Sequence, residues 1–157
     1  MANSLEIQIA DAVVSAINAA TWSETFRAER IYGDIDAPLE ELDRLRVDVL
    51  MPEAWDEHEL DDQSDDSCIA VFEVAIRKKL SMAMQSQVDG GGLREELDRL
   101  YTLAINMARM FMADAFDSLT AHCIDTQLLQ AYDREMLVAM GQFTAVIQLT
   151  FDVRRAL

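Results

Sequence analysis

The end of the chain carries the pattern that most restricts its fold. Between positions 141 and 157, apolar residues occupy every second position: Phe143, Ala145, Ile147, Leu149, Phe151 and Val153. Successive side chains of a β-strand point to opposite faces, so this period of two predicts a strand with one face in the core. We expect the other, mostly polar face to meet solvent or a partner subunit. Such a strand is typical of an antiparallel sheet that packs on helices.

Two segments have the helical spacing needed to cover that sheet. Leu5 to Ala20 repeats apolar residues at helical intervals, and Ser4 is placed to cap its first turn. The triple glycine 90–92 interrupts the chain before a longer helix, predicted from Leu93 to about Asp117. The apolar stripe of this second helix consists of Leu93, Leu97, Leu100, Ala104, Met107, Phe111 and Ala115.

Three further strands are predicted upstream of the second helix. They are the aromatic-bounded stretch Thr25–Tyr32, the period-two stretch 45–52 that stops at Pro52, and the β-branched stretch 68–80. We expect the last two to pair as a hairpin. The remaining segments are predicted to hold a short helical turn from Asp36 to Leu42, and a polar connection 118–126 followed by a short helix near 128–130.

This order of elements lacks the regular strand–helix alternation of a parallel sheet. It predicts an α+β fold, with a mostly antiparallel four-stranded sheet and two main helices packed on one face. A length of 157 residues fits one domain. We therefore expect residues 1–157 to form a single domain that carries an acidic loop at 53–67.

The charge of the chain excludes some partners. The formal net charge is −16, from 29 acids against 13 Lys and Arg, so the chain as a whole repels phosphates. Stable binding to nucleic acid or to an anionic membrane is not expected. Neither a basic leader followed by an apolar core nor an apolar run long enough to span a membrane is present, so we expect the protein in the cytoplasm, with reduced cysteines.

Half of this net charge lies in one segment. Residues 53–66 hold eight acids and no Lys or Arg. Blocks of like charge usually form a solvated loop, and this is the favoured interpretation. The alternatives are an assembly contact, in which Trp55 is an apolar anchor, and divalent-ion binding, for which the spacing lacks the Gly and the terminal Glu of a helix–loop–helix Ca²⁺ site. The acids that would act in either alternative are Asp61, Asp62, Asp65 and Asp66.

Other candidate sites are weaker. Arg77, Lys78 and Lys79 form the one dense basic cluster, which either solubilises a strand end or pairs with the acidic loop of a neighbouring subunit. His58, His122, Cys68 and Cys123 lack the paired spacing of a zinc site. Adjacent residues point to different faces, so His122 and Cys123 do not form a base–thiol pair. No catalytic, cofactor-binding or metal-binding residue is predicted.

Four segments together resemble the tail-terminator or tail-completion proteins of tailed bacteriophages. Their order is IADAVVSAINAATWSETFRAERIY, LEELDRLRVDVLMP, FEVAIRKKL and YDREMLVAMGQFTAVIQLTFDVRR, from Ile9 to Arg155. The resemblance implies a non-enzymatic virion protein of the tail or neck, assembled in the host cytoplasm. It implies a ring, commonly a hexamer, that docks on the tail tube, stops its polymerisation and contacts the head–tail connector or stopper. Segments 53–67 and 118–141 depart from the compact pattern of that family.

Rival functions remain open at this point. Another neck component, such as a head-completion or stopper protein, shares the size and the ring architecture. An acidic regulator that mimics nucleic acid would be monomeric, and a metal-dependent hydrolase would need further ligands beyond the Asp cluster. In the leading hypothesis, DNA passes through the ring without stable binding, because like charges repel.

Overall fold

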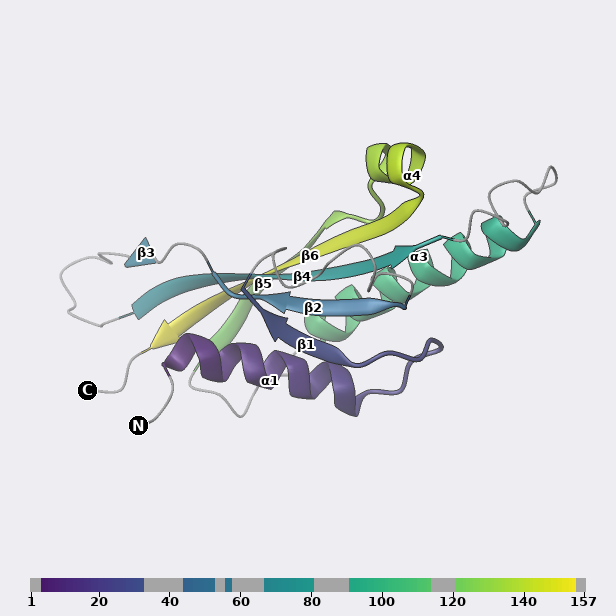
Figure 1. Ribbon diagram of the computed structural model, residues 1–157. Coiled ribbons are helices and arrows are strands. Elements are labelled where there is room, and N and C mark those ends of the chain that lie inside the picture. Colours follow the sequence, from purple (N-terminus) through teal and green to yellow (C-terminus); the bar gives the residue numbers. More distant parts are fainter. Residues whose placement is uncertain are drawn as a thin grey trace.

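The computed structural model describes residues 4–32, 44–52, 56–57, 67–80, 91–113 and 121–154. Figure 1 shows a long twisted sheet with two long helices beside it. In chain order the elements are α1 (Leu5–Ala19), β1 (Ala28–Ile31), β2 (Arg46–Leu50), β3 (Asp56–Glu57), β4 (Ser67–Lys79), α3 (Gly91–Met112), β5 (Ala121–Gln130), α4 (Arg134–Met140) and β6 (Gln142–Arg154). The predicted α+β class is confirmed.

The sheet is larger and more mixed than the sequence predicted. Its strand order is β1-β2-β4-β6-β5, with the short β3 pairing with β4 off this path. From β2 through β4 and β6 to β5, each strand runs antiparallel to the next, and β2 pairs with β4 as expected. β1, in contrast, runs parallel to β2. The predicted four-stranded, mostly antiparallel sheet is therefore corrected to a mixed sheet with five strands along its path.

The core lies on one face of the two central strands. β6 pairs with β4 along its whole length, so that its alternate residues meet those of β4 in pairs such as Phe72 with Leu149 and Val74 with Ile147. These side chains are fully buried, and the rings of Phe72 and Phe151 meet edge to face at 5.6 Å. Burying one such side chain contributes about 1.5–3 kcal/mol. The alternation predicted for the C-terminal strand is confirmed.

Both long helices cover this face. α1 buries Ile9, Val13 and Ile17, four residues apart, in the same hydrophobic cluster as the sheet. The hydroxyl of Ser4 accepts a hydrogen bond from the backbone N–H of Ile7, which satisfies a donor at the start of α1. α3 adds Leu100, Leu103, Met107 and Phe111 to the cluster. The prediction of two main helices on one face agrees with this arrangement.

The region after α3 differs from the prediction. α3 ends at Met112, before the predicted end at Asp117, and β5 occupies the positions predicted as a polar connection and a short helix. The pairing of β5 with β6 shifts register between Cys123 and Asp125 and again between Leu128 and Gln130. These irregularities break the period of two, so the sequence of β5 lacks the alternation that predicts a strand.

A helix that the sequence analysis did not predict joins β5 to β6. Figure 1 shows α4 beside the start of β6 and away from α1. α4 is followed by Gly141, whose φ of 61° suits glycine. The N–H of Leu80 donates to the carbonyl of Gly141 at 2.7 Å, so this turn also fixes the end of β4.

Several predictions lie outside the described residues. These are the helical turn from Asp36 to Leu42, Trp55 and most of the acidic loop, and Gly90 with the linker before it. Gly91 and Gly92, predicted as part of a break before a helix from Leu93, instead form the start of α3. In the part of the chain that the structure describes, no helix combines the length and the apolar character that crossing a membrane requires.

Candidate functional site

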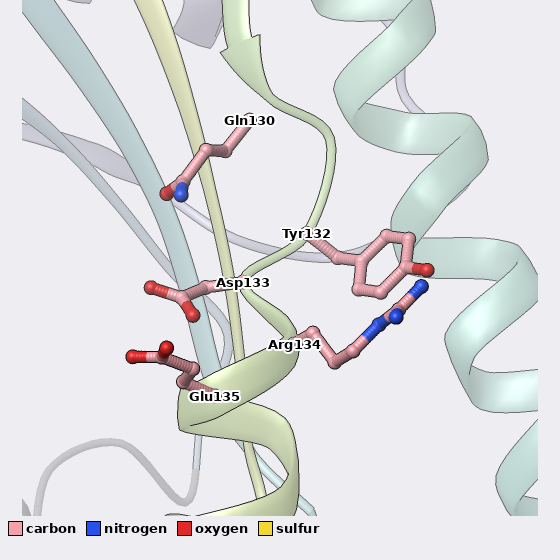
Figure 2. A pocket seen from close by; sticks show the side chains of 5 residues that line it. All are labelled: Gln130, Tyr132, Asp133, Arg134 and Glu135. Carbon is pink, nitrogen blue, oxygen red and sulfur yellow. The ribbon is translucent and has the colours of Figure 1, made fainter.

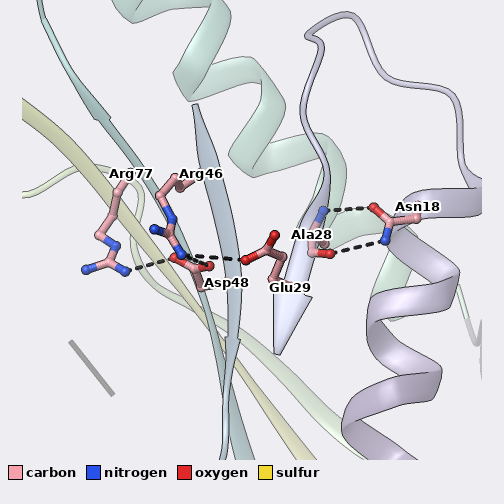
Figure 3. A network of polar contacts seen from close by, with 6 residues as sticks. All are labelled: Asn18, Ala28, Glu29, Arg46, Asp48 and Arg77. Atoms are coloured by element: carbon pink, nitrogen blue, oxygen red, sulfur yellow. Dashed lines mark hydrogen bonds and ion pairs between the residues drawn. The ribbon is translucent and has the colours of Figure 1, made fainter. Parts of the chain in front are cut away.

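A buried ion-pair network lies on the sheet face opposite the core. Asp48 alternates with the core residues Val47 and Val49 and therefore points to the opposite face, yet it is only 1% exposed. Its two carboxylate oxygens accept hydrogen bonds from Arg77 at 2.8 Å and Arg46 at 3.1 Å. Figure 3 shows how these side chains cross from β4 to β2. Buried charges of this kind are tolerated only when paired, so Asp48 holds the two arginines in place.

The strand geometry separates the predicted basic cluster of Arg77, Lys78 and Lys79. Arg77 is buried and bound to Asp48, and Lys78 points to the other face and pairs with Glu96 of α3. Lys79 is exposed at the end of β4. Two of the three cations therefore have partners within the chain. Their pairing with a neighbouring subunit stays a prediction.

The predicted acidic site residues Trp55, Asp61, Asp62, Asp65 and Asp66 lie outside the described residues. The structure places only the backbone of two other acids from this segment. Asp56 and Glu57 form β3, which pairs with Ile69 and Cys68 at the start of β4. The acidic segment is thereby anchored at the end of the sheet opposite to Lys78.

A basic cleft opens beside the edge of the sheet where β1 and β2 pair. It has a volume of about 1100 Å³ and lies between the α1–β1 connection, the start of β2 and the end of β4. Its lining residues are Ser23, Glu24, Thr25, Phe26, Arg27, Glu29, Arg44, Leu45, Arg46 and Lys78. Four cations therefore face two carboxylates in a chain whose net charge is strongly negative.

Hydrogen bonds within the chain fix the wall of the basic cleft. The side chain of Asn18 accepts from the N–H of Ala28 at 2.8 Å and donates to its carbonyl at 3.2 Å, as Figure 3 shows. The indole N–H of Trp22 donates to the carbonyl of Ile17 at 2.7 Å, and its ring lies 6.2 Å from that of Phe26. The connection from α1 to β1 is thus held in one conformation.

The unengaged cations of the basic cleft are Arg27 and Arg44. Both are exposed, and neither has an ion-pair partner among the residues that the structure describes. Glu24 is engaged by Arg99 of α3 at 3.2 Å, and Glu29 lies 3.8 Å from Arg46. No sequence pattern predicts this cleft, because its arginines lie far apart in the chain and are brought together only by the parallel pairing of β1 with β2.

A second surface lies at the opposite edge of the sheet. Large apolar or aromatic side chains are exposed there on four neighbouring segments: Tyr101 on α3, Leu129 on β5, Tyr132 in the turn after β5 and Val138 on α4. We call these four residues the β5 surface. The rings of Tyr101 and Tyr132 are 6.4 Å apart. Figure 2 shows Tyr132 and Arg134 side by side, and a hydrogen bond to Tyr132 raises the pKa of the Arg134 guanidinium. A hollow of about 470 Å³ lies beside them, lined by Gln130, Asp133 and Glu135 as well.

The described residues contain no group of three or more His, Cys, Asp or Glu side chains that could hold a metal ion. The thiol of Cys123 is half-buried and lies 3.6 Å from the hydroxyl of Thr126. Comparison of the chain with models of known protein families gives no match, and comparison with curated proteins gives none either.

Proposed function

We propose that the protein is a non-enzymatic structural subunit of a tailed-phage virion, a tail terminator that forms a ring on the end of the tail tube. The ring would stop tube polymerisation and present a surface to the head–tail connector. The resemblance of four segments to that family motivates the proposal. The structural observation that carries it is that the two outermost described strands, β1 and β5, border surfaces of different chemistry.

A closed ring requires such a difference. In a head-to-tail ring, each subunit contributes one surface to the preceding neighbour and a different, complementary surface to the next. A subunit whose contact surface is complementary to itself would form a twofold dimer instead. Here the β1 side offers the basic cleft and the β5 side offers exposed aromatic and aliphatic residues, so the two sides suit different contacts.

The β5 surface has the composition of an interface core. Aromatic residues are enriched at the centres of protein–protein interfaces, and Val138 is 82% exposed on α4 with no role in the core cluster. Tyr132 is already held by its contacts with Tyr101 and Arg134, so ordering it in a complex costs little conformational entropy. Isolated exposed apolar residues need no explanation, but four from neighbouring elements favour a binding surface.

The same surface disfavours simple addition of a strand from a neighbour. β5 has two register shifts, and irregularities at an edge strand interrupt the row of backbone groups that a further strand would need. Side-chain packing against α4 and the end of β5 is therefore the proposed mode of contact. In the assembled ring, the acidic surplus of the chain would face the lumen in part, so that DNA passes without stable binding.

Sedimentation velocity and electron microscopy of the protein with tail-tube protein test this proposal. We expect closed rings, of hexamer size by the resemblance, at the ends of tubes of uniform length. The double variant Leu129→Asp, Val138→Asp should leave tubes uncapped and overlong, because charges on the β5 surface oppose packing. Met112→Asp is the matched control, since Met112 is also exposed but lies at the end of α3; it should cap tubes normally.

Two results would overturn the proposal. One is a wild-type protein that stays strictly monomeric on tail tubes. The other is a double variant that retains its circular dichroism spectrum and caps tubes as well as the wild type does. Binding to the head connector without any binding to tubes would indicate a stopper, the rival neck component, instead of a terminator.

A further inference from the structure

We propose that the basic cleft is the receptor for the acidic segment Glu53–Asp66 of a second copy of the chain. The inference deepens the proposed ring, because it names the polar contact between neighbouring subunits. It rests on the proposed function only in assuming that two subunits contact each other in an assembly. The peptide–protein contact itself is measurable without a ring or a tube.

The cleft carries positive charge that is not paired within the described residues. Arg27 and Arg44 are exposed and have no ion-pair partner there, whereas the less exposed Lys78 and Arg46 pair with Glu96 and Asp48. A chain with net charge −16 has few surfaces that attract carboxylates, so this cleft is where an acidic ligand gains most. Guanidinium groups also match carboxylates in geometry and bind them through two parallel hydrogen bonds.

The cleft also offers apolar contact. Phe26 and Leu45 are half-buried members of its lining that pack against the core cluster. The acidic segment carries Trp55 among its eight acids. Such a segment is complementary to the cleft, because the aromatic ring can pack on the apolar residues while the flanking carboxylates pair with the arginines.

The chain cannot place its own acidic segment in its own cleft. β3 is anchored opposite Ile69, and the cleft reaches Lys78 on the same strand, nine residues away, which is about 30 Å at the rise of a β-strand. The nine residues 58–66 connect the end of β3 to the start of β4, and both of these ends are anchored together. Even a fully extended connection therefore reaches only about 15 Å from the anchored end at its midpoint. The acids therefore fall short of the cleft of the same chain. Only another molecule can supply them.

This separation makes the subunit polar along its sheet. The acidic segment begins at one end of β4 and the basic cleft lies at the other, so copies placed head to tail bring opposite charges together. Nucleic acid is the less favoured ligand, because phosphates approaching the cleft would meet the field of a strongly acidic chain. That alternative is one outcome of the test.

Fluorescence anisotropy with a labelled synthetic peptide of residues 53–66 and the purified full-length chain tests the inference. We expect saturable binding that weakens as salt rises, because exposed ion pairs are screened. A peptide with every Asp and Glu replaced by Asn and Gln should not bind. Arg27→Glu and Arg44→Glu together should weaken binding by about tenfold or more, since each attraction becomes a repulsion.

Arg109→Glu is the matched control. Arg109 is exposed near the end of α3, and the substitution changes the net charge by as much as either cleft substitution does. We expect it to leave the affinity within about twofold, since an exposed charge far from the contact is screened. Circular dichroism of each variant checks that the fold is kept, which is expected because neither Arg27 nor Arg44 has an ion-pair partner within the described residues.

The inference is overturned if the cleft variants bind the peptide as the wild type does, or if the neutral peptide binds equally well. It is also overturned if a single-stranded oligonucleotide of equal charge displaces the peptide at lower concentration, because the cleft would then be a phosphate site. Rings on tail tubes without peptide binding would sink this inference alone. Peptide binding without rings would sink only the proposed function.

Discussion

Replacing Asp48 with Asn should destabilise the protein strongly. The Asp48 carboxylate is 1% exposed and is the acceptor for two arginines, of which Arg77 is itself buried. Asn keeps the size of the side chain and removes its charge, so the buried Arg77 loses its 2.8 Å ion pair with Asp48. Breaking a buried pair in this way costs about 3–5 kcal/mol. That is a large part of the total stability of a typical domain, about 5–15 kcal/mol.

Urea unfolding followed by circular dichroism measures the effect. With a slope of about 2 kcal/mol per molar urea, a loss of about 3–5 kcal/mol lowers the midpoint by about 1.5–2.5 M. Glu29→Gln is the control: Glu29 belongs to the same network but its side chain is 63% exposed and 3.8 Å from Arg46, so its loss costs at most about 1 kcal/mol.

A second variant separates the charge effect from a packing defect. Replacing both members of the buried pair, Asp48→Leu with Arg77→Met, removes both buried charges together and should recover most of the stability lost in Asp48→Asn. If Asp48→Asn and Glu29→Gln lower the midpoint equally, burial does not strengthen this network, and the reasoning is wrong.

Two further substitutions test the register of β6 and the turn before it. Phe151→Asp should abolish the folded circular dichroism signal, because it places a charge in the core. Asp152→Ala should keep the signal, because one oxygen of Asp152 is buried without a hydrogen-bond partner and its removal breaks no hydrogen bond of that oxygen. Equal loss in both would show that the assigned register is wrong. Gly141→Ala should lower the free energy of unfolding by about 1–2 kcal/mol, since alanine is strained at a φ of 61°; a thermal melt that is unchanged would contradict this.

Local sequence patterns determined the elements that carry the core. The alternation through Phe143 to Phe151 fixed both the existence and the facing of β6, because a strand with one buried face admits only one register. The helical spacing of Ile9, Val13 and Ile17 and the capping position of Ser4 likewise predicted α1. These features depend on neighbours within a few residues, which is the information that a linear sequence carries.

Edges and polar contacts were decided by the tertiary structure. β5 is an edge strand with two register shifts, so its sequence lacks the alternation that reveals a buried strand. The parallel pairing of β1 with β2 is set by the path of the chain between them and has no local signature.

The candidate sites show the same division. Arg77, Lys78 and Lys79 form one cluster in the sequence, but the pleat of β4 sends Arg77 to Asp48 and Lys78 to Glu96. Arg27 and Arg44 are unremarkable in the sequence and meet in the basic cleft through strand pairing. The sequence alone determined how much charge the chain carries and in which segment half of it lies. Only the tertiary structure decided which charges neutralise one another, because ion pairing depends on distances between residues far apart in the chain.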